Sequence, residues 1–208
     1  MTTPAFDVIV CGSLHLDIML YAPHLPRPDE TVPGQRWDQQ CGGKGANQAV
    51  MAAKAGARTA MIGRVGDDDF GRRLLAHLAA ANVEASAVAT DPTAGSGMSA
   101  AIVRDDGDYG AVIVSGANLN IEAAGLGDVW RGLGGARVVV LQNEISEAAN
   151  IAAATAARDA GASVILNAAP ARAMAPALLD RVDVLVVNRV EAAMLSGRDV
   201  AGRDDALA

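Results

Sequence analysis

Short apolar runs alternate along this chain with segments in which apolar residues recur at helical spacing. The runs are rich in β-branched residues, which is typical of strands. Between them, apolar residues at i, i+3, i+4 and i+7 predict helices at about 46–53, 70–78 and 147–160. This alternation predicts an α/β fold with a mostly parallel central sheet. Its strands are expected at 6–10, 58–62, 137–141, 163–166 and 182–187.

Two stretches interrupt the alternation. Residues 16–40 contain four prolines, which are too many for a helix because proline lacks the amide hydrogen. Residues 98–103 and 109–114 flank the turn-rich segment RDDGD, a pattern that predicts a β-hairpin. A hairpin does not belong in a parallel sheet, so we expect these pieces to form a small separate sheet that acts as a lid. The expected domain covers 1–208, with lid segments at about 15–40 and 97–115.

A lysine surrounded by glycines precedes the first predicted helix, in the segment CGGKGANQAV at 41–50. Gly42, Gly43 and Gly45 leave backbone amides unshielded and allow positive φ angles. Asn47 lies in the first turn, where free N–H groups offer partners to an anion or a polyhydroxylated ligand. The alternative is a glycine loop that only permits close helix packing.

This segment matches neither common nucleotide-binding loop. A Walker A motif requires Ser or Thr after its lysine, and Gly45 follows Lys44 here. A Rossmann fingerprint requires G-x-G-x-x-G after a strand, and we find no such spacing and predict no strand leading into the segment.

Composition excludes several classes of partner. The 17 basic and 24 acidic residues give a net charge of −7, which disfavours nucleic acid and anionic membranes as partners. No signal-peptide pattern and no apolar run of membrane-spanning length occurs, so we expect a cytoplasmic protein. Cys11 and Cys41 fit a reducing compartment and lack the spacing of metal ligands, so small buried residues are their expected role.

Polar residues follow several predicted strands, at the edge where open α/β sheets bind ligands. They form three groups, at 12–17, 142–144 and 188–191, and all three can converge on the Gly-rich helix. Asp17 and Asn47 suit hydrogen bonds to sugar hydroxyls.

Each of these candidates also has a structural alternative. Asp17 equally fits a role in stabilising a turn, and Glu144 fits a charge at a helix N-terminus. Asn188 and Glu191 lie on one helix face at i, i+3, and they equally fit an N-cap with its capping-box glutamate.

Several short segments together carry a resemblance to a known family that none of them would establish alone. They are Gly12-Ser13 with Asp17, GGKGANQA at 42–49, GRVGD at 63–67, GAN at 116–118, LQNE at 141–144, NAAPAR at 167–172 and residues 188–191. In order and spacing over nearly the whole chain, they resemble the ribokinase branch of the PfkB carbohydrate kinase family.

The resemblance implies a ribokinase-like three-layer sandwich with a β lid. It also implies a kinase that uses ATP and Mg²⁺ to phosphorylate a primary hydroxyl of a sugar or nucleoside. Asn188 and Glu191 would belong to the phosphate and Mg²⁺ region, mostly through water, with no direct metal ligand. Two copies would pair through their lids. The substrate-binding residues would be His15, Asp17, Gly43, Lys44, Gly45, Asn47 and Glu144.

Two features depart from the family pattern. His15 stands where ribokinases have an asparagine that touches ribose, which changes the shape and donor pattern of the pocket. His15 would contact a different sugar, contact a base, or face the lid. The Gly-Ala-Gly-Asp signature, whose aspartate is the catalytic base, is absent, so we expect the base beyond Ala208, together with any site for a monovalent cation such as K⁺.

Two functions remain open at this stage. The first is a sugar or nucleoside kinase of which this chain carries the substrate-binding half, with the C-terminal part of the fold missing and no activity alone. The second is a non-catalytic module that binds or senses a sugar or nucleoside. A sheet that ends near Val187 would leave an edge and an apolar face uncovered, which favours the first.

Overall fold

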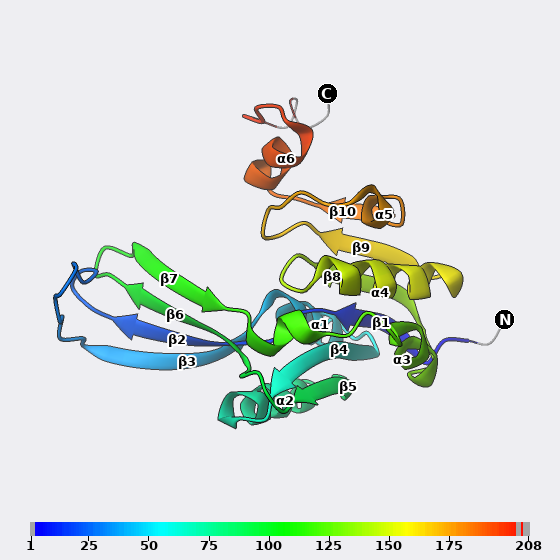
Figure 1. Ribbon diagram of the computed structural model, residues 1–208, viewed down its shortest axis with the longest axis horizontal. Helices are drawn as coiled ribbons and strands as arrows, with labels where there is room; N and C mark the ends of the chain where they lie inside the picture. The colour runs from blue at the N-terminus through cyan, green and yellow to red at the C-terminus, as the bar shows by residue number, and fades with distance from the viewer. Residues whose placement is uncertain (1–2, 203–204, 206–208) are drawn as a thin grey trace.

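A six-stranded sheet forms the centre of the protein in the computed structural model, which describes residues 3–202 and 205 (Figure 1). Its strand order is β10-β9-β8-β1-β4-β5, and every neighbouring pair is parallel. The carboxyl ends of all six strands therefore lie at one edge of the sheet. The strands are β1 (Phe6–Cys11), β4 (Thr59–Gly66), β5 (Glu84–Asp91), β8 (Ala136–Gln142), β9 (Ser163–Asn167) and β10 (Val184–Val186).

Helices cover both faces of this sheet, because successive side chains on each strand point to opposite sides. In β1, Ile9 and Cys11 belong to the apolar cluster on one face, and Val10 belongs to the cluster on the other. The first cluster includes residues of α3 (Leu126–Gly132), α4 (Glu147–Asp159) and α5 (Pro176–Leu179). The second includes residues of α1 (Lys44–Lys54) and α2 (Asp69–Ala80).

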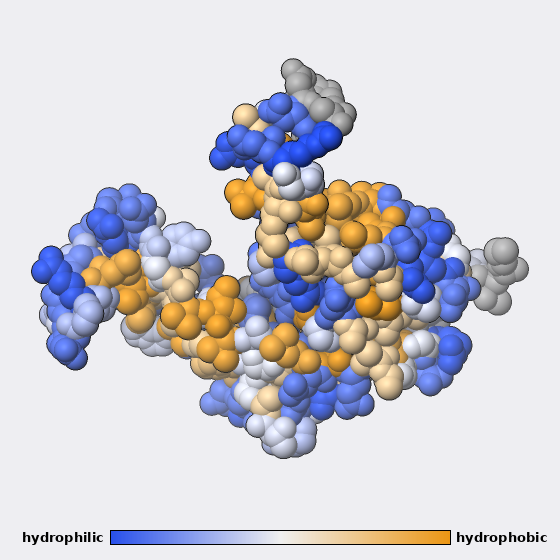
Figure 2. Space-filling view, turned by 45° about the horizontal axis from the view of Figure 1, so that its top comes forward, coloured by the Kyte–Doolittle hydropathy of each residue, from blue (hydrophilic) through white to orange (hydrophobic). Residues whose placement is uncertain are grey.

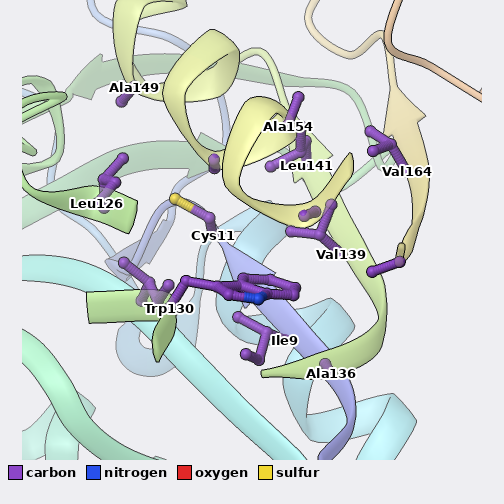
Figure 3. Close-up of a cluster of buried hydrophobic side chains, with 14 of the residues drawn as sticks. Ile9, Cys11, Leu126, Trp130, Ala136, Val139, Leu141, Ala149, Ala154 and Val164 are labelled. Carbon is purple, nitrogen blue, oxygen red and sulfur yellow. The ribbon is translucent and has the colours of Figure 1, made fainter. Parts of the chain in front are cut away.

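The first cluster has one aromatic ring at its centre. Trp130 of α3 lies among Ile9, Ala136 and Val139, as Figure 3 shows. Alanines of α4 complete this layer, and small side chains allow that helix to approach the sheet closely. The result is the three-layer α/β arrangement expected from the sequence.

A second sheet of four strands extends from the carboxyl edge of the main sheet (Figure 1). Its order is β3-β2-β6-β7, with β2 antiparallel to β3, β2 parallel to β6, and β6 antiparallel to β7. The expected hairpin is present as β6 and β7. The strands are β2 (His15–Tyr21), β3 (Arg36–Gly42), β6 (Gly97–Val103) and β7 (Tyr109–Val114).

One buried side chain ties the two sheets together. Asn118 lies in the short 3₁₀ segment η1 (Gly116–Asn120), and its Oδ1 accepts from the amide of Leu14 at 2.8 Å. Its Nδ2 donates to the carbonyl oxygens of Leu14 and Ser115 at 2.8 and 2.9 Å. Leu14 lies in the connection from β1 to β2, and Ser115 follows β7. Asn118 therefore fixes these two connections between the sheets relative to each other.

The structure corrects one expectation about the Gly-rich segment. We predicted no strand leading into it, but β3 runs directly into Gly43 and α1. The strand escaped notice because it lies at an edge of the second sheet and is mostly polar and exposed. The last expected strand is shorter than predicted, and Asn188 begins the helix α6 (Arg189–Ser196) as its N-cap.

Several large apolar side chains remain at the surface. Figure 2 shows exposed hydrophobic residues along the second sheet. Others lie on the edge strand β10. None of the helices in the described ranges is long and apolar enough to cross a membrane.

Candidate sugar-binding site

A pocket of about 520 Å³ lies between the carboxyl edge of the main sheet and one face of the second sheet. We call this face the inner face and define it by the side chains of β2, β6 and β7 that line the pocket. The base of the pocket is formed by the first turn of α1 and by Glu144. The lining residues are His15, Asp17, Met19, Gln40, Gly43, Lys44, Asn47, Ser99, Ala101, Val103, Gly107, Tyr109, Ala111, Ile113 and Glu144.

The pocket brings together most of the substrate-site candidates of the sequence analysis. His15 and Asp17 come from β2, Lys44 and Asn47 come from the first turn of α1, and Glu144 follows β8. Gly43 also lines the pocket, whereas the candidate Gly45 is buried beneath it. These segments are far apart in sequence and meet because β1 and β8 are neighbours whose carboxyl ends lie together.

The first turn of α1 does not offer free N–H groups, contrary to our expectation. The amide of Lys44 donates to Glu144 Oε2 at 2.9 Å, and the amide of Gly45 donates to Ser13 Oγ at 3.3 Å. The amide of Ala46 donates to the carbonyl oxygen of Ser13 at 2.9 Å. Because these donors are occupied, a ligand at this helix meets the side chains of Lys44 and Asn47 rather than a backbone anion site.

Gly43 permits this arrangement through its backbone. It is the N-cap of α1 with φ of 88°, a region that favours glycine. A Cβ atom at this position would lie 2.7 Å from the amide nitrogen of His15. Glycine is therefore required where α1 begins against the strand that carries His15.

Glu144 links three parts of the site. Its Oε2 accepts from Ser13 Oγ at 2.5 Å as well as from the Lys44 amide, which fixes the carboxylate. Its Oε1 lies 3.7 Å from Lys44 Nζ, an ion pair in which the lysine side chain is 38% exposed. Oε1 and the ammonium group thus lie together at the base, as an acceptor and a donor for hydroxyl groups.

Asp17 supplies a second carboxylate on the wall of the pocket. Its Oδ1 accepts a hydrogen bond from Ser99 Oγ on the neighbouring strand β6. Its Oδ2 lies so close to Gly42 that a Cβ atom there would come within 2.3 Å. Asp17 therefore belongs to a paired strand position rather than to a turn, the alternative considered from the sequence.

His15 is packed into the wall and is only 4% exposed. Burial holds the pKa of its imidazole below the usual 6.5, against smaller opposing effects of Glu144 and Asp17. Its Nδ1 lies 3.8 Å from Glu144 Oε2, too far for a hydrogen bond, and Nε2 has no partner among the described residues. Gly97 leaves room for the ring, because a Cβ atom there would lie 2.4 Å from His15 Cδ2.

Asn188 and Glu191 do not line the pocket, although Asn188 follows β10 at the same edge of the main sheet. They form the capping box of α6. Asn188 Oδ1 accepts from the Glu191 amide at 2.9 Å, and Glu191 Oε2 accepts from the Asn188 amide at 2.8 Å. In addition, Asn188 Nδ2 donates to Glu191 Oε1 at 2.9 Å.

The described ranges contain no group of three or more His, Cys, Asp or Glu side chains that could hold a metal ion. The Glu191 carboxylate accepts N–H donors at both oxygens and is only 6% exposed, so it is engaged in the capping box. Mg²⁺ usually keeps several waters and is held largely by substrate phosphates, so a site of that kind would need few direct ligands from these two residues.

Sequence reasoning missed several residues of the site. Ser13 and Asn118 were noted only as parts of motifs, and Ser99 was not considered. Ser99 faces Asp17 because of the register between β2 and β6, which no local pattern reveals. The apolar inner-face residues were missed for the same reason, since the register across the second sheet determines which side chains share a face.

The fold and this pocket define a class of protein. The chain matches the model of the pfkB family carbohydrate kinases over residues 5–208. It therefore belongs to this family.

Individual relatives are kinases of pentoses. The chain is 34% identical over 198 residues to ribokinase of Mus musculus, and it covers 61% of that protein with 95% of its own length. It is 30% identical to deoxyribokinase of Salmonella typhimurium, with 93% of this chain and 64% of the relative covered. The chain thus spans somewhat less than two thirds of the length of these curated relatives.

A solved structure extends the similarity to three dimensions. The structure of Arabidopsis thaliana ribokinase complexed with ribose and ATP superposes with a TM-score of 0.88 at 30% identity. The superposition covers 99% of this chain and 67% of the Arabidopsis chain. The fold is therefore that of the ribokinases, including the mostly parallel central sheet.

Proposed function

We propose that this chain forms the substrate-binding part of an ATP-dependent kinase that phosphorylates a primary hydroxyl of a sugar or nucleoside. One observation carries the proposal. Hydroxyl-binding groups from separate parts of the sequence, Asp17, Lys44 and Glu144, line one pocket at the carboxyl edge of the main sheet. The membership of the pfkB family and the pentose kinases among the relatives support the same activity.

The residues of the pocket would act by binding and orienting the substrate. The Asp17 and Glu144 carboxylates accept from substrate hydroxyls, and Lys44 Nζ and the Asn47 amide donate to others. Phosphoryl transfer requires mainly positioning and charge stabilisation, so a sugar held at several points directs one hydroxyl toward the phosphate. The second sheet would act as the lid that excludes water from this pocket.

ATP would supply the phosphoryl group, and Mg²⁺ would accompany its phosphates. Asn188 and Glu191 lie at the same sheet edge as the pocket, two strands beyond β8, and are the residues of this chain that we assign to that region. Their capping box fixes the start of α6, and any contact with a cation would be mostly through water, because both Glu191 oxygens already accept N–H donors.

Two copies would pair through the outer face of the second sheet. We define the outer face by the side chains that alternate with those of the inner face. Its exposed residues include Leu20, Trp37, Val112 and Val114. An apolar patch of this kind on a single-layer sheet marks an interaction surface.

Ligand binding tests the proposal directly. We expect D-ribose, 2-deoxy-D-ribose or a nucleoside to raise the melting temperature of the protein, because a ligand of the folded state stabilises it. Asp17→Asn should weaken the binding of that ligand by about tenfold to a hundredfold, since it removes a charged hydrogen-bond partner. Asp128→Asn is the matched control, because Asp128 is exposed on α3 outside the pocket.

The outcomes bear separately on the site and on the activity. Binding of a pentose or nucleoside supports the proposed site. Binding without release of ADP from ATP is expected under both functions considered from the sequence, because the Gly-Ala-Gly-Asp signature is absent from these 208 residues. Release of ADP by this chain would support a kinase and would contradict the expectation that the chain is inactive alone. If no pentose or nucleoside binds to the folded protein, the site assignment is wrong.

A further inference from the structure

The inner face of the second sheet is ordered in three successive rows of side chains. The register between β2, β6 and β7 places residues directly opposite one another across the three strands. Along a strand, side chains on one face repeat every two residues, or about 7 Å. The first row is Asp17, Ser99 and Ile113, the second is Met19, Ala101 and Ala111, and the third is Tyr21, Val103 and Tyr109.

Polarity differs along the three strands β2, β6 and β7, whereas the neighbouring edge strand β3 carries Asp38 and Arg36 opposite Met19 and Tyr21. The charged and amide groups of the pocket lie at its base or in and beside the first row, where Asp17 pairs with Ser99 and Gln40 lies opposite Asp17 on β3. Beyond the first row, the pocket is lined on β2, β6 and β7 by Met19, Ala101, Ala111, Val103 and Tyr109.

This distribution of polar and apolar side chains does not suit a free sugar over the whole length of the pocket. A pentose carries hydroxyls around its ring, and a hydroxyl held against an apolar wall loses its hydrogen bonds to water without replacement. The base and the first row can satisfy a single sugar ring. The second and third rows extend the pocket wall by about 14 Å beyond the first row, without another charged side chain on these three strands.

The shape of the apolar rows indicates what they would contact. Ala101 and Ala111 lie directly opposite each other in the second row, so the middle of the wall is shallow. Larger side chains, Met19 in the same row and Tyr109 in the next, rise on either side of it. Tyr109 is 70% exposed and presents a free aromatic ring beside the pocket. A flat heteroaromatic ring can lie on the alanines and pack against Tyr109.

We propose that the acceptor of this site is a nucleoside, with its sugar at the polar base and its heteroaromatic base on the second and third rows. This inference rests on the proposed function and narrows its substrate class. Such a base would cover Tyr109, which is 70% exposed and lines the same pocket as Asp17.

Matched ligands isolate the contribution of the base. Isothermal titration calorimetry compares uridine and adenosine with methyl β-D-ribofuranoside, which has the same sugar in the same anomeric form and no base. We expect at least one nucleoside to bind about tenfold more tightly or better, the range that a modest apolar contact supplies. D-Ribose serves as the second reference.

Matched variants test whether the tighter binding of the nucleoside arises on the inner face. Ala101→Asp places a charge in the second row and should abolish the tighter binding of the nucleoside while the affinity for the methyl riboside stays within about twofold. Ala100→Asp makes the same change on the adjacent residue, which faces the opposite side of β6. It should leave both affinities unchanged. Met19→Gln provides a second test if Ala101→Asp does not fold.

The results distinguish this inference from the function on which it rests. If the methyl riboside or ribose binds as tightly as both nucleosides, the inference is overturned and the sugar-binding function stands. If Ala101→Asp and Met19→Gln leave a nucleoside preference intact, the base does not lie on these rows and the inference is also overturned. If none of these ligands binds to the folded protein, the proposed function itself fails.

Discussion

Ser13 is fully buried and holds two parts of the site together through one hydroxyl group. Its Oγ donates to Glu144 Oε2 and accepts from the amide of Gly45, while its carbonyl oxygen accepts from the amide of Ala46. The position of the Glu144 carboxylate relative to α1 therefore depends on this side chain.

Replacement of Ser13 should affect both stability and binding. Ser13→Ala leaves the Gly45 amide without its acceptor and removes one hydrogen bond of the Glu144 carboxylate, which should lower the free energy of unfolding by about 1–3 kcal/mol. We also expect ligand affinity to fall about fivefold to tenfold, because Glu144 loses one of its two fixed hydrogen bonds. Urea unfolding and calorimetry measure the two effects.

A second serine provides the control. Ser146 caps α4 through its hydroxyl, which accepts from the Ala149 amide, and it does not line the pocket. Ser146→Ala should cost about 1 kcal/mol of stability and leave ligand affinity unchanged. An equal loss of affinity in both variants would show that Ser13 acts only through general stability.

His15 should make stability depend on pH in a defined direction. Its pKa is lowered in the folded protein, mainly by burial, so the folded state binds fewer protons than the unfolded chain. The contribution of His15 to stability is therefore fully present above about pH 6.5 and is lost as the pH falls. We expect His15→Asn to reduce the fall in melting temperature between about pH 8 and about pH 5.

The exposed residue His24 tests whether this effect is specific. Its side chain is half exposed and contacts Glu30 outside the pocket. His24→Asn should keep the pH dependence that His15→Asn reduces. If the two variants respond to pH equally, burial of His15 is not the cause.

At this scale the sequence predicted which residue types would meet but not how they would be paired. Asp17, Lys44 and Glu144 were expected together because they follow strands or begin a helix at one sheet edge. The occupied amides of α1 could not be foreseen, since the acceptors come from Ser13 and Glu144, which are distant in sequence.

At the scale of elements, α1 has a glycine with positive φ near each end. Gly43 precedes its first turn with φ of 88°, and Gly56 follows its last with φ of 94°. Their surroundings differ, because a Cβ atom at Gly43 would meet His15 and Leu14, whereas nothing lies within 4 Å of one at Gly56. The same substitution at both positions therefore separates backbone strain from steric conflict.

Gly56→Ala should lower stability by about 1–2 kcal/mol, the usual cost of a left-handed residue with a side chain. Gly43→Ala should lower it by at least about 1 kcal/mol more, because the added methyl group overlaps the backbone before β2. Urea unfolding of both variants measures the difference. Equal losses would mean that the junction between α1 and β2 can relax.

The buried strands and amphipathic helices of the main sheet were predictable from their patterns. The elements that escaped prediction have weak patterns for physical reasons. β3 and β5 lie at sheet edges with many exposed residues, and α5 has only four residues. The parallel pairing of β2 with β6 joins segments about 80 residues apart, which no local signal records.

At the scale of the whole molecule, the outer face of the second sheet predicts self-association. Val112 is 67% exposed on this face, so Val112→Asp should weaken a dimer about tenfold or more by placing a charge in an apolar interface. Val190→Asp is the control, because Val190 is 66% exposed on α6, outside the second sheet. Sedimentation velocity over a range of concentrations measures both. A wild-type protein that stays monomeric would contradict the prediction.

The second sheet is one layer thick. Away from the main sheet, each of its side chains therefore lies on the inner face or on the outer face, and few of them belong to a core. If a nucleoside base lies on the second and third rows as proposed, exchange of a side chain there alters which ligand is accepted without disturbing the packing of the three-layer body. Natural variation can then change selectivity in small steps on these rows, while the groups assigned to the sugar, Asp17, Lys44 and Glu144, stay unchanged.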